Sequence, residues 1–306
     1  MGILVIGATF VDIKGFPYDN YLPTGRNAGR VEYVHGGVAR NVVEDIANVE
    51  LRPIFLSIVD DTPMGTAVVQ KLQRHKVNTD YVLTRPDGMG TWLAVFDNNG
   101  DVAGSISKRP NMYPIAELLA QRGEEIFAEA SSVVLEIGLD KEIVKSTLSL
   151  AQKHHVKTIA LVANMSIAAE RRDLLQQFDC VICNQQEAGI LFLDDYEGKS
   201  PEEMRDILAQ RISFARIPSM VVTMGAEGAV YASAQGETGI CPARKVQVKD
   251  TTGAGDAFCA GVAIGMTYGK TMAESVEIGT TLAASVITSS ENVCPRFLPE
   301  ELGIRL

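Results

Sequence analysis

Two carboxylates flank a turn of small residues between Asp250 and Phe258, DTTGAGDAF, and the small apolar run FCAGVAIG overlaps its end. Gly253 and Gly255 allow the backbone to turn tightly and to approach a ligand closely. The run that follows is typical of a helix, so Gly253, Ala254 and Gly255 would lie in its first turn. There, unpaired N–H groups and the positive end of the helix dipole form a site for phosphate oxygens.

Asp256 is the residue of this turn whose chemistry is most informative. A carboxylate beside a phosphate costs electrostatic energy, so we expect Asp256 to accept a proton rather than to bind the phosphate. The alternative is structural: Asp256 caps the helix, and the glycines only permit close packing.

Polar residues also follow two strands predicted in the second half of the chain. Asn184 and Glu187 lie one helical turn apart near a strand end, an arrangement that can hold Mg²⁺ through water because this ion keeps several of its waters. A capping box has the same spacing and is the alternative. Thr223 begins the segment TMGAEG after the next strand, in which Gly225, Gly228 and the hydroxyl could contact a phosphate tail.

A third group of candidate residues, in the first half of the chain, suits a polyol. Asp12 follows a predicted strand and would lie where open α/β sheets bind ligands; a turn aspartate is the alternative. Gly36 and Gly37 open a predicted helix and permit close approach of a ligand, and Asn41 can both donate and accept hydrogen bonds. Glu136 ends another predicted strand.

Helix and strand patterns alternate along most of the chain. One predicted helix follows Gly36 and Gly37, with its apolar stripe starting at Val38. The other predicted helices span 64–75, 115–128, 141–154, 171–178 and 201–215. The predicted strands span 1–7, 53–59, 132–137, 158–162, 180–183 and 219–223. This alternation predicts an α/β fold with a doubly wound, mainly parallel sheet and helices on both faces.

Two segments depart from the alternation and predict a small β-sheet outside the main one. Residues 13–35 lack a helical period, and the ranges 91–96 and 102–107 flank the turn DNNG, a clear hairpin signal. We therefore expect a single domain over residues 1–306, with a lid sub-domain formed by about residues 13–35 and 89–109 and inserted in the α/β core.

Bulk composition limits the classes of function. The 306 residues are 46% hydrophobic, carry a net charge of −10 and contain no basic block, which argues against nucleic acid and anionic membranes as partners. No apolar run approaches the length of a membrane span and no signal peptide is recognisable, so we expect a cytoplasmic protein. Cys180 and Cys183 form a CxxC within an apolar run, which indicates buried strand thiols rather than a zinc or redox pair.

Taken together, these motifs resemble those of the ribokinase-like (PfkB) carbohydrate kinase family, nearly from end to end. The segment DTTGAGD at 250–256 is similar to the C-terminal signature of the family and is highly specific. GGVARN at 36–41 is similar to the N-terminal signature, NQQE at 184–187 to the NxxE motif, and TMGAEG at 223–228 to the TxGxxG nucleotide segment. The order and spacing of the motifs agree throughout.

The resemblance implies a role for each matched residue. Asp256 would be the catalytic base that accepts a hydroxymethyl proton, and Gly253, Ala254 and Gly255 would form the anion hole for the transferring phosphoryl group. Asp250 would belong to a monovalent-cation loop, as in members that use K⁺. The remaining matches would bind the sugar (Asp12, Gly36, Gly37, Asn41, Glu136), ATP (Asn184, Thr223, Gly225, Gly228) and Mg²⁺ through water (Glu187).

The substrate is less well defined by the resemblance. The segment Gly29–Asn41 and the strand 91–96 look similar to pseudouridine kinases, whereas Glu136 looks more like ribokinase. Lys108-Arg109 replaces an acidic residue expected after the hairpin; these cations are either solvated lid charges or contacts for an anionic substrate. Ala163-Asn164 also departs from the Asp-Pro or Asp-x-Asn of many members.

The resulting prediction is an ATP- and Mg²⁺-dependent kinase, with K⁺ as a further candidate cofactor. It would phosphorylate a primary hydroxyl of a sugar or nucleoside, ribose- or pseudouridine-like. The alternatives are a kinase of a sugar acid or sugar phosphate and, in another class, a non-catalytic sugar or nucleotide sensor on the same fold. Family analogy suggests a homodimer joined through the lid sheets, because the apolar lid strands would leave a sheet face to cover.

Overall fold

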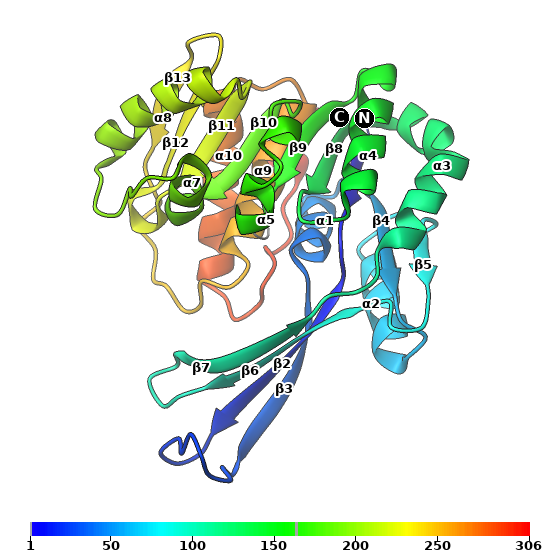
Figure 1. Cartoon of the computed structure of the whole chain (residues 1–306), viewed down its shortest axis with the longest axis vertical. Helices are drawn as coiled ribbons and strands as arrows, with labels where there is room; N and C mark the ends of the chain where they lie inside the picture. The colour runs from blue at the N-terminus through cyan, green and yellow to red at the C-terminus, as the bar shows by residue number, and fades with distance from the viewer. Residues whose placement is uncertain (1, 163–164) are drawn as a thin grey trace.

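The computed structural model describes residues 2–162 and 165–306 of the chain, which form two β-sheets and their helices (Figure 1). The larger sheet contains β1 (Gly2–Ile6), β4 (Ile54–Val59), β5 (Val82–Thr84), β8 (Ala130–Glu136), β9 (Lys157–Leu161), β10 (Cys180–Asn184), β11 (Ser219–Thr223), β12 (Ala229–Ser233) and β13 (Thr238–Cys241). The smaller sheet contains β2 (Phe10–Pro17), β3 (Gly29–Gly36), β6 (Gly90–Phe96) and β7 (Val102–Lys108).

Helices connect most of the strands of the larger sheet. They are α1 (Val38–Asn48), α2 (Pro63–Arg74), α3 (Tyr113–Ala128), α4 (Lys141–His154), α5 (Met165–Ala169), α6 (Arg172–Leu175), α7 (Gln185–Phe192), α8 (Pro201–Ala215), α9 (Ala254–Thr267) and α10 (Met272–Ile287), with short 3₁₀ turns η1 (Gly225–Glu227) and η2 (Pro299–Leu302). Within the two described ranges, none of these helices has the length and apolar character that crossing a membrane requires.

The larger sheet is doubly wound, as predicted. Its strand order is β13-β12-β11-β10-β9-β8-β1-β4-β5, parallel from β11 to β5 and antiparallel only at β12 and β13. Side chains alternate between its faces: Ile3 and Val5 of β1 pack with the core formed by α1, α2, α9 and α10, whereas Leu4 and Ile6 pack with the core of α3, α4 and α6–α8. Helices therefore cover both faces, and this part of the prediction is confirmed.

Strand order reverses at β1, and this reversal indicates where along the sheet a ligand is expected to bind. From β1 the chain runs outward through β4 to β5 and then returns to the other side of β1 to continue through β8, β9 and β10. In open α/β sheets a crevice forms at this reversal, outside the carboxyl ends of the strands. The segments that follow β1 and β8 are therefore expected to line a ligand site.

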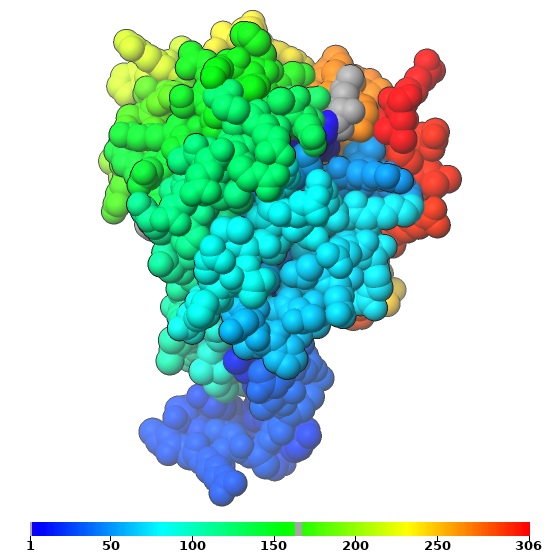
Figure 2. Space-filling view, turned by 90° about the vertical axis from the view of Figure 1, so that its right-hand side faces the viewer, coloured from blue at the N-terminus to red at the C-terminus, as the bar shows by residue number. Residues whose placement is uncertain are grey.

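The smaller sheet has the strand order β3-β2-β6-β7 and projects from the α/β body (Figure 1). The space-filling view shows its blue β2–β3 region as a narrow extension below the body (Figure 2). The predicted hairpin of β6 and β7 is confirmed. However, the sheet begins at Phe10, before residue 13: Asp12 follows the end of β1, as predicted, but pairs with Val34 and Trp92 inside β2, a strand that was not expected to include it.

The second half of the chain contains further differences from the predicted elements. The helix predicted over 171–178 is only Arg172–Leu175, because the amides of Gln177 and Phe178 bond to carbonyls three residues back and tighten the turn. Helices α5, α7 and α10 and the antiparallel strands β12 and β13 were not predicted. Ala163-Asn164, the pair that departs from the family pattern, lies outside the described residues.

Candidate active site

A cavity of about 870 Å³ opens where the reversal of strand order predicts a site. Its walls come from the segments after β1 and β8, the N-terminal turns of α1 and α9, and one face of the smaller sheet. Six of the predicted site residues line it: Asp12, Gly37, Asn41, Glu136, Gly253 and Asp256. The tertiary structure therefore brings together candidates that lie more than two hundred residues apart in sequence.

The turn at 253–256 is the N-terminus of α9, as predicted. Gly253 caps the helix with φ of 83°, and a Cβ there would lie 2.1 Å from the carbonyl oxygen of Asn292, so both backbone and space demand glycine. The amide of Ala254 donates to Thr251 O at 3.2 Å. For the amides of Gly255 and Asp256, residues 2–162 and 165–306 supply no acceptor.

These two amides are suited to an anion. They belong to the first turn of a fourteen-residue helix, where N–H groups and the helix dipole attract negative charge. Gly255 is exposed, and a Cβ built there would meet nothing within 4 Å, so the space beside this residue is open. The arrangement fits a phosphoryl group, although the amide of Ala254 is already used within the turn.

Asp256 is half-buried and faces the cavity. Its Oδ2 accepts a hydrogen bond from Asn41 Nδ2 at 2.6 Å. Burial raises the pKa of Asp256 to about 7, with the neighbouring carboxylates Glu136 and Asp12 acting in the same direction, while the Asn41 bond and the charge of Arg40 oppose the rise. A carboxylate with a pKa near neutrality is suited to general-base catalysis.

Asn41 is held between Asp256 and a buried cluster in α1. Its Oδ1 accepts hydrogen bonds from Arg40 Nη2 and from Asn292 Nδ2. Arg40 is 1% exposed and pairs with Glu44, which is fully buried. The apolar stripe of the helix did not indicate this second buried face, because periodicity marks apolar positions and gives no signal for a buried ion pair.

Asp12 and Glu136 add two carboxylates to the cavity. A Cβ at Gly36 would lie 2.4 Å from Asp12 Oδ1, so Gly36 makes room for this side chain instead of lining the cavity itself. Glu136 ends β8 and accepts a hydrogen bond from the amide of Ala8 at 2.9 Å. Burial raises the pKa of both carboxyl groups. Both can accept hydrogen bonds from the hydroxyl groups of a sugar.

The smaller sheet contributes Trp92 and Ser107 to the cavity wall, and neither was predicted as a site residue; Arg109, which the sequence left open as a contact for an anionic substrate, follows them. Trp92 lies opposite Asp12 in β2 and opposite Ser107 in β7, and all three side chains line the cavity. Arg109 follows the end of β7 and lines it too, where its charge opposes the rise in the pKa of Glu136 that burial causes. The hairpin pattern predicted the strands, but the face of each residue depends on their register.

Lys108 and Arg109, adjacent in sequence, have different surroundings. Lys108 Nζ pairs with Asp87 Oδ1 at 2.7 Å, and both side chains are exposed. Arg109 instead contributes to the cavity wall. Each of the two sequence alternatives therefore matches one of these cations: Lys108 is a solvated charge, and Arg109 is placed to meet a ligand.

The predicted nucleotide residues lie at the ends of neighbouring strands. Asn184 and Thr223 are register partners at the ends of β10 and β11, and Gly225 and Gly228, with φ of 58° and 98°, bracket the turn that follows β11. This edge continues from β8, where Glu136 reaches the cavity. The strand order therefore places the two groups of residues along one edge of the sheet.

Asn184 and Glu187 form the capping box that the sequence left as the alternative. Asn184 Oδ1 accepts from the amide of Glu187, and Glu187 Oε2 accepts from the amide of Asn184, both at 2.8 Å. Burial raises the pKa of Glu187. In the part of the chain that the structure describes, Glu187 Oε1 accepts no hydrogen bond. This oxygen can therefore accept one from a water molecule bound to Mg²⁺.

Asp250 lies in the exposed turn before α9. Its Oδ1 accepts a hydrogen bond from the amide of Thr252 at 2.8 Å. Among the described residues, no group of three or more His, Cys, Asp or Glu side chains is placed to hold a metal ion. The monovalent-cation role of Asp250 therefore stays a prediction.

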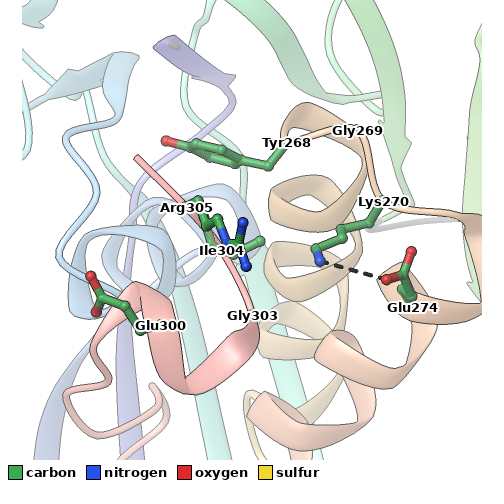
Figure 3. A pocket seen from close by; sticks show the side chains of 8 residues that line it. All are labelled: Tyr268, Gly269, Lys270, Glu274, Glu300, Gly303, Ile304 and Arg305. Carbon is green, nitrogen blue, oxygen red and sulfur yellow. Dashed lines mark ion pairs between the residues drawn. The ribbon is translucent and has the colours of Figure 1, made fainter.

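A second cavity, of about 690 Å³, contains none of the predicted site residues (Figure 3). It lies between the turn after α9 and the C-terminal segment, and its Lys270 Nζ pairs with Glu274 Oε1 at 3.5 Å. Lys157, at the start of β9, donates to the carbonyl of Met266 nearby, so this is the edge of the sheet at the strand amino ends. We therefore assign the candidate active site to the first cavity.

The CxxC prediction is confirmed as a strand feature. Cys180 and Cys183 are buried in β10, and neither forms a disulfide. Burial raises the pKa of the Cys180 thiol to about 12 and raises the pKa of the Cys183 thiol well above its ordinary value. Both thiols are therefore protonated and unreactive at neutral pH.

Comparison with known proteins agrees with this geometry. Residues 2–294 match the sequence model of the family described as pfkB family carbohydrate kinase. The chain belongs to this family. The PfkB kinases that it resembles include a guanosine-inosine kinase of Exiguobacterium acetylicum, 33% identical over 95% of both chains, and a pseudouridine kinase of Escherichia coli K12, 28% identical over 90% of this chain and 86% of the other.

A solved structure confirms the fold. The Arabidopsis thaliana ribokinase complexed with ribose and ATP superposes with a TM-score of 0.86, covering 96% of this chain and 95% of that one at 21% identity. The predicted ribokinase-like fold is therefore confirmed. The family membership and these named relatives support a sugar or nucleoside kinase.

Proposed function

We propose that this PfkB kinase transfers a phosphoryl group from ATP to the primary hydroxyl of a nucleoside. The observation that carries the proposal is the placement of Asp256: a carboxylate with a pKa of about 7 at the N-terminus of α9, facing a cavity of about 870 Å³. Phosphoryl transfer requires positioning and charge stabilisation rather than a covalent nucleophile, and this site provides both.

In the proposed reaction, Asp256 accepts the proton of the hydroxymethyl group as its oxygen bonds to the γ-phosphorus and the bond to the β–γ bridging oxygen breaks, releasing ADP. The amides of Gly255 and Asp256 donate to the negative charge that develops on the transferring group, because the described residues offer them no other acceptor. Gly253 keeps the turn open enough for this approach.

Asn184, Thr223, Gly225 and Gly228 would contact ATP along the ends of β10 and β11. Glu187 would hold Mg²⁺ through water, and the ion would neutralise charge on the phosphate oxygens. The structure of the ribokinase complexed with ATP supports ATP as the donor, because the two folds agree over nearly their whole lengths. K⁺ near Asp250 would be a further cofactor.

A nucleoside is favoured as the acceptor by the wall that the smaller sheet contributes. The row Asp12–Trp92–Ser107 presents a carboxylate for ribose hydroxyl groups beside an indole ring on which a base can stack. Arg109 could donate to base acceptors such as the O6 and N7 of a purine. The name of the Exiguobacterium relative, guanosine-inosine kinase, points to the same class of substrate.

Arg109 also favours a second candidate, a sugar phosphate or sugar acid, because a guanidinium binds an anionic group well. Four carboxylates in the same cavity, those of Asp12, Glu136, Asp140 and Asp256, oppose a negatively charged substrate, so we rank this candidate second. A non-catalytic sensor ranks third, since sensing alone would require neither the amide pair nor a base whose pKa lies near 7.

We further propose that the smaller sheet is a lid and that its outer face joins two copies of the chain. On that face, register places Tyr33, Ile13, Leu93 and Ile106 in one row across the four strands. Tyr33 and Ile106 are 62% and 69% exposed, which is costly for large apolar side chains in water. An identical sheet from a second copy would cover this row.

The test is ADP release with Mg²⁺-ATP against inosine, guanosine, adenosine, pseudouridine, ribose, fructose 6-phosphate and 2-keto-3-deoxygluconate. We expect the highest kcat/KM with a nucleoside. Trp92→Ala should then raise the KM for the nucleoside about 10-fold, whereas Trp92→Phe, which keeps a ring for stacking, should raise it less. Turnover only with the phosphorylated or acidic sugar would favour the second candidate, and ATP binding without turnover would favour a sensor.

A further inference from the structure

Arg40 occupies a position that stability alone does not explain. It is the third residue of α1, where a cation opposes the helix dipole, and its side chain is 1% exposed. Burying an ion pair such as Arg40–Glu44 costs desolvation energy, and apolar residues of similar volume often serve as well or better. The placement therefore indicates a role for the charge and the hydrogen bonds of this guanidinium.

The guanidinium lies directly behind Asn41. It donates to the carbonyl oxygens of His35 and Gly36, to Glu44 Oε2 and to Asn41 Oδ1. Lys71 Nζ pairs with the other oxygen of Glu44 at 2.8 Å, so the carboxylate is held from both sides. These contacts fix the guanidinium in one orientation, with one edge directed at the amide of Asn41.

The hydrogen bonds around Asn41 determine which end of its amide faces Asp256. Arginine has only donors, and the amide nitrogen of Asn292 is also a donor, 3.3 Å from the same Asn41 oxygen. Two donors therefore converge on Asn41 Oδ1, which leaves Nδ2 to donate to Asp256 Oδ2 at 2.6 Å. Without them the amide could rotate and place its oxygen against the carboxylate, where the two would repel.

Several other ionisable groups face Asp256 from the surrounding elements. Asp45 lies on α1 with Arg40, Asp12 on β2, Glu136 at the end of β8 and Cys259 on α9. Of the charged groups that change the pKa of Asp256, Arg40 is a cation and lowers it, whereas the carboxylates Glu136 and Asp12 raise it. Burial and these carboxylates favour the protonated acid, which cannot serve as a base.

We propose that Arg40 is a positioning residue for the proposed base: it locks the Asn41 amide so that Nδ2 holds Asp256, and its charge keeps that carboxylate ionised. This inference rests on the proposed function, because it assigns Arg40 to the base of that reaction. Arg40 does not line the cavity, so it acts through Asn41 and through its charge rather than by touching the substrate.

The test compares three variants. Arg40→Met combined with Glu44→Gln removes both members of the buried pair, so no uncompensated charge of that pair is left in the helix. Lys71→Met is the matched control, because it removes the other cation bound to Glu44 but contacts neither Asn41 nor Asp256. Arg40→Lys keeps a charge and loses the planar fork that bonds Asn41, His35 O and Glu44 together.

The readout is the titration midpoint of Asp256, followed by NMR of isotope-labelled aspartate carboxyl groups and assigned by its loss in Asp256→Asn. We expect a rise of about one pH unit in the double variant, with the acid limb of kcat/KM moving alongside it, and no change in Lys71→Met. An unchanged midpoint in the double variant, or an equal rise in Lys71→Met, would overturn the proposal.

Arg40→Lys covers the case in which the double variant does not fold. It should raise the midpoint by about half a pH unit, because the amide of Asn41 is released while the charge remains. An unchanged midpoint in this variant would refute the locking of Asn41. The NMR midpoint requires no turnover. If the wild-type protein showed no kinase activity while the variants still shifted the midpoint, the proposed function would be refuted and the placement of Arg40 would stand.

Discussion

Asn41 Nδ2 donates to Asp256 Oδ2 at 2.6 Å, although the two residues lie 215 positions apart in the chain. This bond joins the N-terminal turn of α1 to the N-terminal turn of α9, so the glycine-rich motifs at the two ends of the chain form one site. Asn41 was predicted to hold sugar hydroxyl groups. In the structure its donor serves the proposed base, and its oxygen is bonded to Arg40 and Asn292.

Replacing Asp256 by Asn should abolish most turnover while the fold and ATP binding persist. The amide has a similar shape but cannot accept the hydroxyl proton, and general-base catalysis contributes roughly 10²–10⁴-fold. ADP release would measure kcat, and calorimetry would measure ATP binding. Near-normal kcat in Asp256→Asn would show that another group, or none, acts as the base.

The kcat/KM of the wild-type enzyme should fall on the acid side with a midpoint near pH 7. Burial raises the pKa of Asp256 to about 7, so the carboxylate is the main form above that pH and the inactive acid is the main form below it. A pH series at constant ionic strength would measure the midpoint. A midpoint near the ordinary aspartate value of 3.8 would contradict the burial of the base.

Asp45→Asn should weaken the dependence of stability on pH. Asp45 is fully buried, its Oδ1 accepts from the amide of Cys294 at 2.6 Å, and burial raises its pKa well above 3.8. The folded protein therefore retains a proton that the unfolded chain has lost above 3.8, so the free energy of unfolding decreases as pH rises through that window. Asparagine does not titrate and removes this contribution.

Urea unfolding at a series of pH values would measure the effect of Asp45 on the free energy of unfolding. The wild-type free energy of unfolding should decrease more steeply with pH than that of Asp45→Asn, whereas the exposed Asp61→Asn should follow the wild type. Parallel pH dependences for the wild type and Asp45→Asn would show that Asp45 is ionised in the folded protein.

Glu187→Gln should increase the Mg²⁺ concentration needed for half-maximal activity. The chain offers a matched control, because Ser200 and Glu203 form a capping box on α8 with the same reciprocal hydrogen bonds as Asn184 and Glu187 on α7. Glu203→Gln should cost a similar fraction of the roughly 1 kcal/mol that a helix cap contributes, without changing the Mg²⁺ requirement. Equal Mg²⁺ requirements in both variants would show that Glu187 acts only as a helix cap.

Ile106→Lys should convert the proposed dimer into a monomer. The side chain is 69% exposed at the end of the apolar row on the outer face of the smaller sheet, and a lysine there would face a second copy of the same charge. Light scattering after size-exclusion chromatography would measure the mass. A wild-type mass of 33.0 kDa would itself contradict the proposal.

Local features of the chain were sufficient to predict the main elements and the principal motif. Hydrophobic periodicity specified α4 and α8 to the residue, and the turn DNNG specified the β6–β7 hairpin, because each pattern depends only on neighbouring residues. The segment DTTGAGD likewise predicted a helix N-terminus at Gly253, since small residues before an apolar run determine that turn locally.

Other features of the site required the tertiary structure. Trp92 faces the cavity only because the register of β2 and β6 places it beside Asp12, and a shift of one residue would turn it to the opposite face. The buried pair Arg40–Glu44 meets Lys71 only because α2 packs beside α1. The Asn41 oxygen that Arg40 bonds meets Asn292 only through long-range packing. The sequence by itself determined local conformation and the chemical groups available, whereas long-range packing decided which groups meet and, through burial, how strongly Asp256 holds its proton.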